Sequence, residues 1–112
     1  FNKYKNTMLI NFKDEDLVDK VNKEEISVIQ FSASWCAPCK ALKPIMEKLS
    51  DEFKESSNFY YADIDSDAIN TASSMAVRGV PTVVILKNGA EVSRKVGGLP
   101  EGQMRDFLKE NL

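Results

Sequence analysis

The stretch Ser34–Lys40, which reads SWCAPCK, holds both cysteines of this 112-residue chain, Cys36 and Cys39. Apolar residues then recur at helical spacing on one face, and the pattern predicts a helix from Cys36 to about residue 54. The two cysteines would lie in its first turn, close enough to form a disulfide. Unpaired N–H groups and the positive end of the helix dipole favour a thiolate there, so Cys36 is predicted to be the attacking sulfur.

Two other interpretations of the cysteine pair must be weighed. A zinc site takes about four ligands, and a chain with two cysteines and no histidine could complete one only with carboxylates. We therefore expect no metal. A purely structural disulfide would close a very short loop and constrain the unfolded chain little. Thiol–disulfide exchange through a mixed disulfide is the favoured interpretation, with Cys39 as the more buried, resolving thiol.

Composition narrows the function further. Fifteen basic and seventeen acidic residues give a net charge of −2, which offers no basic field for nucleic acid. The longest apolar run, residues 83–86, is far too short to span a membrane. The length suits one domain, residues 1–112. The chain starts at Phe1 and its first methionine is Met8, so residues 1–7 are a candidate tag or extension.

Hydrophobic periodicity and turn residues predict the secondary structure. We expect strands over residues 8–10, 26–31, 58–63, 82–86 and 91–96, and helices over 13–22, 36–54, 68–76 and 101–112. Asn88-Gly89 is a strong hairpin signal between the last two strands. Strands joined by crossover helices should be parallel and the hairpin antiparallel. The fold class is therefore α/β, a central mixed β-sheet flanked by helices on both faces.

The segment Trp35–Lys40 resembles the active-site motif of the thioredoxin family, with Ala37 where that family usually has glycine. Four further segments resemble the family in the same order along the chain: the helix-kinking Pro44, residues 77–82 around Pro81, the hairpin at residues 87–89, and the Gly97-Gly98 loop. The resemblance runs from about Met8 to Leu112. It implies the thioredoxin fold in a single domain.

The resemblance also implies roles for individual residues. Cys36 would be the nucleophile and Cys39 the resolving thiol. Pro81 would be cis and lie against the disulfide, while the Val80 backbone would hydrogen-bond an extended substrate segment. The residues that would line the same surface are Trp35, Gly97 and Gly98. Trp35, as a flat surface beside the nucleophile, and three further neighbours would tune the site: Ala37 through its lower flexibility, Pro38 by restricting the disulfide loop, and Lys40 through its charge.

Two positions depart from the family pattern. Members typically carry a buried aspartate six residues before the first cysteine and a lysine on the next strand that pairs with it; here these positions are Gln30 and Tyr61. Losing both partners avoids a buried unpaired charge. Gln30 cannot take a proton near neutral pH, so loss of the Cys39 proton would rely on water, on the departing thiolate, or on a carboxylate such as Asp63 or Asp65. The alternative is that Gln30 only satisfies neighbouring polar groups.

These observations predict a protein-disulfide reductase that cycles between a Cys36–Cys39 dithiol and disulfide. The resemblance implies electrons from NADPH through a thioredoxin reductase, disulfide-containing protein substrates, no bound cofactor, and a monomer. We expect a cytoplasmic protein; processing into an organelle or the periplasm is the alternative. Two other functions stay open: a disulfide oxidase or isomerase in an oxidising compartment, and an interaction subunit that does not use its thiols.

Overall fold

The computed structural model describes residues 9–112, so the proposed extension at residues 1–7 and the start of the first predicted strand lie outside it. Five strands form one sheet: β1 (Leu9–Phe12), β2 (Ile26–Ser32), β3 (Asn58–Asp63), β4 (Thr82–Lys87) and β5 (Ala90–Val96). The helices are α1 (Asp16–Asp19), a 3₁₀ turn η1 (Val21–Lys23), α2 (Ala37–Glu52), α3 (Ile69–Ser74) and α4 (Glu101–Asn111). None of the helices in this part of the chain is long and apolar enough to cross a bilayer.

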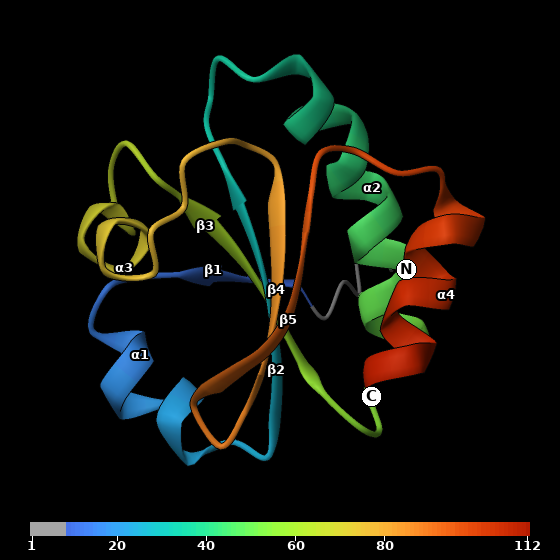
Figure 1. Cartoon of the computed structure of the whole chain (residues 1–112), viewed down its shortest axis with the longest axis horizontal. Helices are drawn as coiled ribbons and strands as arrows, with labels where there is room; N and C mark the ends of the chain where they lie inside the picture. The colour runs from blue at the N-terminus through green and yellow to red at the C-terminus, as the bar shows by residue number, and fades with distance from the viewer. Residues whose placement is uncertain (1–8) are drawn as a thin grey trace, which may run out of the picture.

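The sheet is mixed, as the sequence predicts. Its strand order is β1-β3-β2-β4-β5. β2 is parallel to β3 and antiparallel to β4, and β3 is also parallel to β1. The last pair, β4 and β5, is the predicted antiparallel hairpin. β2 therefore lies in the middle of the sheet and carries the chain directly into α2, which places the cysteine segment at the carboxyl end of a central strand (Figure 1).

Helices cover both faces of the sheet, with α2 and α4 on one side and α1 and α3 on the other (Figure 1). Alternate residues of β2 therefore enter two separate cores. Val28 packs with Leu42 and Met46 of α2 and with residues of α4. Ile29 and Phe31 pack on the opposite face. Burial on both faces explains why the apolar residues of this strand do not alternate in the sequence.

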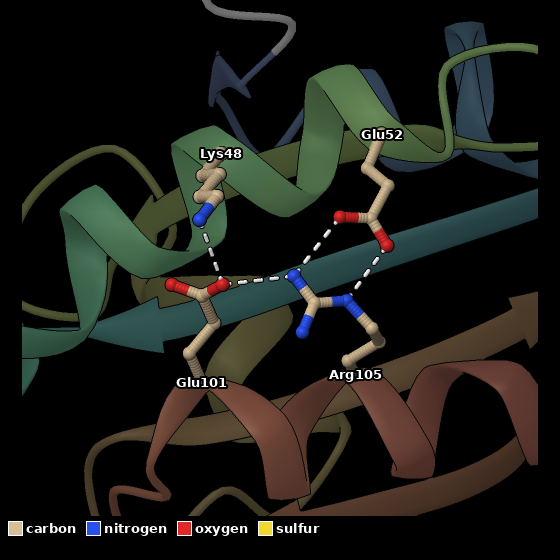
Figure 2. A network of polar contacts seen from close by, with 4 residues as sticks. All are labelled: Lys48, Glu52, Glu101 and Arg105. Atoms are coloured by element: carbon tan, nitrogen blue, oxygen red, sulfur yellow. Dashed lines mark hydrogen bonds and ion pairs between the residues drawn. The ribbon is translucent and has the colours of Figure 1, made fainter.

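A network of charged side chains joins α2 to α4 (Figure 2). Arg105 donates to both carboxylate oxygens of Glu52, at 2.7 and 3.0 Å, and also to Glu101 at 2.8 Å. Lys48 contacts the same Glu101 oxygen at 2.9 Å. The hydrogen bonds from Arg105 lower the pKa of Glu52, and those from Lys48 and Arg105 lower the pKa of Glu101. The network ties the helix that carries the cysteines to the last helix of the chain.

The predicted helix over residues 13–22 is wrong in its length. The α-helix covers only Asp16–Asp19, because the backbone of Lys20 leaves the helical region (φ −127°, ψ −63°) before the 3₁₀ turn. After the break, Val21 is fully buried in the core cluster that also contains Ala72 of α3. The other predicted helices are confirmed to within a few residues at their ends.

Candidate active site

Cys36 is the N-cap residue of α2. Its backbone is extended (φ −92°, ψ 105°), and its sulfur accepts a hydrogen bond from the backbone N–H of Cys39 at 3.2 Å. A sulfur in the N-cap position thus satisfies a donor that the helix leaves unpaired. Pro38 lies in the first turn, where its missing N–H removes no helix bond. Two residues of the cysteine motif, Cys36 and Pro38, therefore also favour the start of the helix at this point.

Cys36 and Cys39 are joined as a disulfide, with their Cα atoms 5.3 Å apart. Cys39 is fully buried, whereas 4% of Cys36 is exposed. The pair packs with Ala33, and Ile64 and Val80 lie against it. As a residue, Cys36 is thus slightly more exposed than Cys39, and their roles as nucleophile and resolving thiol stay predictions.

The neighbours of the disulfide in the sequence lie on the surface. Trp35 is 69% exposed, and Ala37, Pro38 and Lys40 are exposed as well. No hydrogen bond or ion pair of Lys40 leads to either sulfur within residues 9–112. The buried cysteine pair is thus flanked by exposed residues. The tuning roles of these four residues stay predictions.

The Pro81 loop and the glycine loop meet beside the disulfide. The Val80–Pro81 peptide bond is cis, as expected, and Pro81 is buried. Its carbonyl accepts a hydrogen bond from Gly97 N–H at 2.8 Å. Gly97 has φ +96°, a conformation that favours glycine. The backbone of Val80 takes part in no turn or loop hydrogen bond among the described residues, and its pairing with a substrate segment stays a prediction.

Gly98 lies on the other side of the same surface. A Cβ added to it would be 4.0 Å from the Pro38 side chain. Between them is a shallow, mainly apolar hollow of about 170 Å³. Six residues from α2 and the loop before α4 line it: Pro38, Ala41, Leu42, Ile45, Gly98 and Leu99. The predicted surface residues are therefore brought together around the disulfide, although they lie in three separate segments of the chain.

Gln30 and Tyr61 are direct neighbours in the register of β2 and β3. Gln30 is fully buried, and its amide nitrogen donates to the Cys39 carbonyl at 3.2 Å. Tyr61 is half-buried, and the ammonium nitrogen of Lys43 lies 4.6 Å from the centre of its ring. The two departures from the family pattern are thus paired in space, and each contacts α2.

Two contacts at the site were not anticipated from the sequence. The indole of Trp35 donates to the Asp65 carboxylate at 2.7 Å. This bond engages one of the two carboxylates considered as a proton acceptor for Cys39, and no hydrogen bond links Asp63 or Asp65 to Cys39 within residues 9–112. The second is Lys43 over Tyr61. The one signal for it is that Lys43 follows Cys39 by four residues, which places both on one helix face.

The described residues contain no group of three or more His, Cys, Asp or Glu side chains that could hold a metal ion. An N-cap sulfur beside a buried second sulfur is suited to exchange with an external disulfide.

Comparison with known proteins identifies the family. The model of the Thioredoxin family matches residues 8–110. Thioredoxin C-2 of Corynebacterium nephridii is 31% identical over 105 residues, which cover 93% of this chain and 96% of that protein. Thioredoxin-3 of Dictyostelium discoideum is 35% identical, over 93% of this chain and 97% of that protein. Thioredoxin of Haemophilus influenzae is 30% identical over the same shares.

The match covers nearly the whole chain and includes the five-stranded sheet and the cysteine pair at the start of α2. The chain belongs to the thioredoxin family, and it is a thiol–disulfide oxidoreductase whose redox centre is the Cys36–Cys39 pair.

Proposed function

We propose that this protein reduces disulfide bonds in other proteins and that NADPH supplies the electrons through a thioredoxin reductase. The observation that carries the proposal is the position of Cys36. Cys36 is the N-cap residue of α2 and the more exposed residue of the pair. The helix N-terminus favours the thiolate form, which is the nucleophile in disulfide exchange.

The proposed cycle balances with the two thiols alone. The Cys36 thiolate attacks one sulfur of a substrate disulfide, and the other substrate sulfur leaves as a thiolate that takes up a proton. Cys39 then loses its proton and attacks Cys36, which breaks the mixed disulfide and releases the second substrate thiol. Two electrons have passed to the substrate, and the Cys36–Cys39 bond has formed. A reductase dithiol would reopen it by the same exchange.

Substrate recognition is proposed to use the backbone beside the disulfide. An extended segment can pair with Val80, while Trp35 and the apolar hollow by Gly98 accept flanking side chains. Main-chain pairing reads little of the substrate's sequence. It therefore favours a broad set of disulfide-containing proteins rather than one partner.

The direct test is NADPH oxidation with a thioredoxin reductase and insulin as the disulfide substrate. We expect turnover with the native protein and none with Cys36→Ser. Absence of turnover with reductases from several sources, together with a glutathione equilibrium that favours the dithiol strongly, would instead assign an oxidase or isomerase. That outcome would overturn the reducing direction while leaving the exchange chemistry intact.

We also propose that the protein acts as a cytoplasmic monomer. Outside the site, the exposed large apolar residues are few and come from four elements, β1, α1, α3 and β5; scattered residues of this kind need no partner to cover them. A chain with only two cysteines, both in the redox centre, suits a reducing compartment. Light scattering after gel filtration and fractionation of cells test the two statements separately.

A further inference from the structure

The carboxamide of Gln30 is only half satisfied. Gln30 is fully buried in the middle of β2, and its nitrogen donates to the Cys39 carbonyl at 3.2 Å. Its oxygen is the one buried side-chain nitrogen or oxygen without a hydrogen-bond partner in residues 9–112. The Cys39 carbonyl can only accept, so the amide cannot turn around to pair its oxygen instead. A buried acceptor without a donor carries a free-energy cost.

The sulfur of Cys39 becomes a donor in the dithiol state, where it needs a hydrogen-bond partner. In the disulfide its sulfur carries no hydrogen, so it has nothing to donate. Reduction by an external dithiol adds two electrons and two protons, breaks the S–S bond and gives Cys39 a buried S–H group. The hydrophobic residues packed around the cysteines are Ala33, Ile64 and Val80, whose side chains offer no acceptor for this group. A new donor therefore appears on Cys39, the residue whose backbone carbonyl already accepts from the nitrogen of the same carboxamide. The unpaired oxygen belongs to that carboxamide.

We propose that Gln30 is a positioning residue of the redox cycle and that its side-chain oxygen accepts the S–H of Cys39 in the dithiol form. This bond holds Cys39 as the neutral thiol while Cys36 attacks the substrate. When Cys39 closes the disulfide, its proton passes to the departing substrate thiolate, and the Gln30 oxygen loses its donor again. Gln30 takes up no proton at any stage. It stabilises the dithiol relative to the disulfide.

The first test is the equilibrium of the cysteine pair with reduced and oxidised glutathione at fixed pH. Gln30→Met keeps the length of the side chain but has no carbonyl oxygen. It removes the bond in the dithiol and the unpaired acceptor in the disulfide, and both changes favour disulfide formation. We expect the equilibrium constant for disulfide formation to rise roughly threefold to tenfold, the effect of one weak hydrogen bond. An unchanged or lower constant overturns the proposal.

Ser27→Ala is the matched control. Ser27 is also fully buried on β2, and its hydroxyl donates to Glu24 at 2.8 Å, away from the cysteines. Its loss should weaken both redox forms equally and leave the glutathione equilibrium unchanged. An equal rise in the Ser27→Ala protein would mean that any buried polar loss on this strand moves the equilibrium. That result also overturns the role of Gln30.

The second test needs no change at Gln30. In a Cys36→Ala variant the only thiol is that of Cys39, so its S–H stretching band can be read by infrared spectroscopy. We expect a band at lower frequency than that of an alkanethiol in carbon tetrachloride, and a shift back toward that reference when Gln30→Met is added. A band at the frequency of the free thiol overturns the proposal. The inference rests on the proposed function only for the cycle it serves, and failure of the insulin assay would alter neither the band nor the glutathione equilibrium.

Discussion

The indole N–H of Trp35 donates a hydrogen bond of 2.7 Å to the carboxylate of Asp65. Trp35 precedes the redox centre, and Asp65 lies in the turn after β3, so the bond links two segments at the end of the sheet that carries the cysteines. Asp65 is itself held by its backbone N–H, which donates to the Asp63 carboxylate at 2.9 Å. We expect this bond to restrain the orientation of the exposed Trp35 side chain next to Cys36.

Removing this bond should lower the rate of reaction with protein substrates without changing the reactivity of the two thiols. We expect Asp65→Ala to lower kcat/KM for insulin reduction about twofold to fivefold, as loss of one hydrogen bond between exposed groups implies. Asp65→Asn retains an acceptor and should stay near the native value. Trp35 is the only tryptophan in the chain, so its fluorescence anisotropy reports the loss of orientation directly. Unchanged anisotropy in Asp65→Ala would contradict the proposed restraint.

The apolar hollow beside Pro38 should matter to protein substrates and not to small disulfides. Gly98→Val would project into it, since a Cβ there has only ordinary contact with Pro38 at 4.0 Å. We expect kcat/KM for insulin to fall roughly tenfold or more, in line with the 1–3 kcal/mol (about 10–200-fold) that a change of one apolar group in a pocket is worth. Reaction with a small aromatic disulfide should be unaffected. Gly102→Ala, on α4 with nothing near its Cβ, is the control; a loss of both activities in Gly98→Val would point to damage of the centre instead.

The short helix α3 is capped by a residue far away in the sequence. Its own N-cap, Ala68, has no side chain that can cap. Instead Asp14 accepts hydrogen bonds from the N–H groups of Thr71 at 2.7 Å and Asn70 at 3.1 Å. Burial acts to raise the pKa of Asp14, but the bonds from Thr71 and Asn70 outweigh it, so the pKa lies below its usual value.

Asp14→Ala should therefore lower the free energy of unfolding by about 1 kcal/mol, the usual cost of a lost helix cap. Because the pKa is lowered on folding, this contribution is present at neutral pH and is lost as the pH falls through the folded-state pKa of Asp14. Urea unfolding of both proteins at pH 7 and at about pH 2.5 measures this difference. Equal gaps at the two pH values would show that the carboxylate charge is not involved.

Asp14 also shows why part of the structure was beyond the sequence. Strands and long helices follow from local patterns of apolar residues, so the sheet, α2 and α4 could be predicted. A capping residue that lies 57 positions away from the helix residue it bonds has no local signal in the sequence. The break at Lys20 is similar: no glycine or proline marks it in residues 13–23, and the Val21 that follows is buried among residues from distant parts of the chain. Tertiary contacts can override the secondary structure that local propensity favours.

Features of the site also fall into two groups, those with a local sequence signal and those that depend on tertiary contacts. The motif around Cys36 could be identified because its residues are contiguous and each has a local role at a helix start. Gln30 could be located by its spacing from Cys36, but its unpaired oxygen depends on how α2 lies over β2. The bond between Trp35 and Asp65 joins two loops with no sequence relation. The thiol–disulfide chemistry of the site could thus be predicted from the sequence, whereas the contacts around the cysteine pair could not.

The charged network between α2 and α4 should contribute to stability in a manner that depends on pH and salt (Figure 2). The pKa values of Glu52 and Glu101 are lowered by their bonds to Arg105 and Lys48, so the contribution is present above the usual carboxyl pKa and is lost as the pH falls through the folded values. Arg105→Met should lower Tm by a few degrees at pH 7 and by less at pH 3 or in concentrated salt. Lys54→Met, which removes an isolated exposed pair with Asp51, should do less. Equal losses in the two variants would show that the network adds nothing beyond single pairs.

The juxtaposition of Gln30 and Tyr61 allows the charge pair typical of the family to be rebuilt and measured. Gln30→Asp alone places a carboxylate in a fully buried position, and at pH 7 we expect a loss of about 3–5 kcal/mol in the free energy of unfolding. Burial raises the pKa of the introduced carboxyl, so the loss should be absent below the usual carboxyl pKa and should grow as the pH rises toward the folded-state value. Urea unfolding across pH tests the sign.

Tyr61→Lys alone should also destabilise the protein, because the new ammonium would lie beside Lys43, which now packs over the Tyr61 ring at 4.6 Å. Combining both substitutions supplies the buried carboxylate with a partner, and we expect the double variant to recover about half of the summed loss. The same variant should give the resolving step of a single turnover a new ionisation, since a carboxylate beneath Cys39 can accept its proton and the native amide cannot. Additive losses and an unaltered pH profile would show that the two positions do not act as a pair.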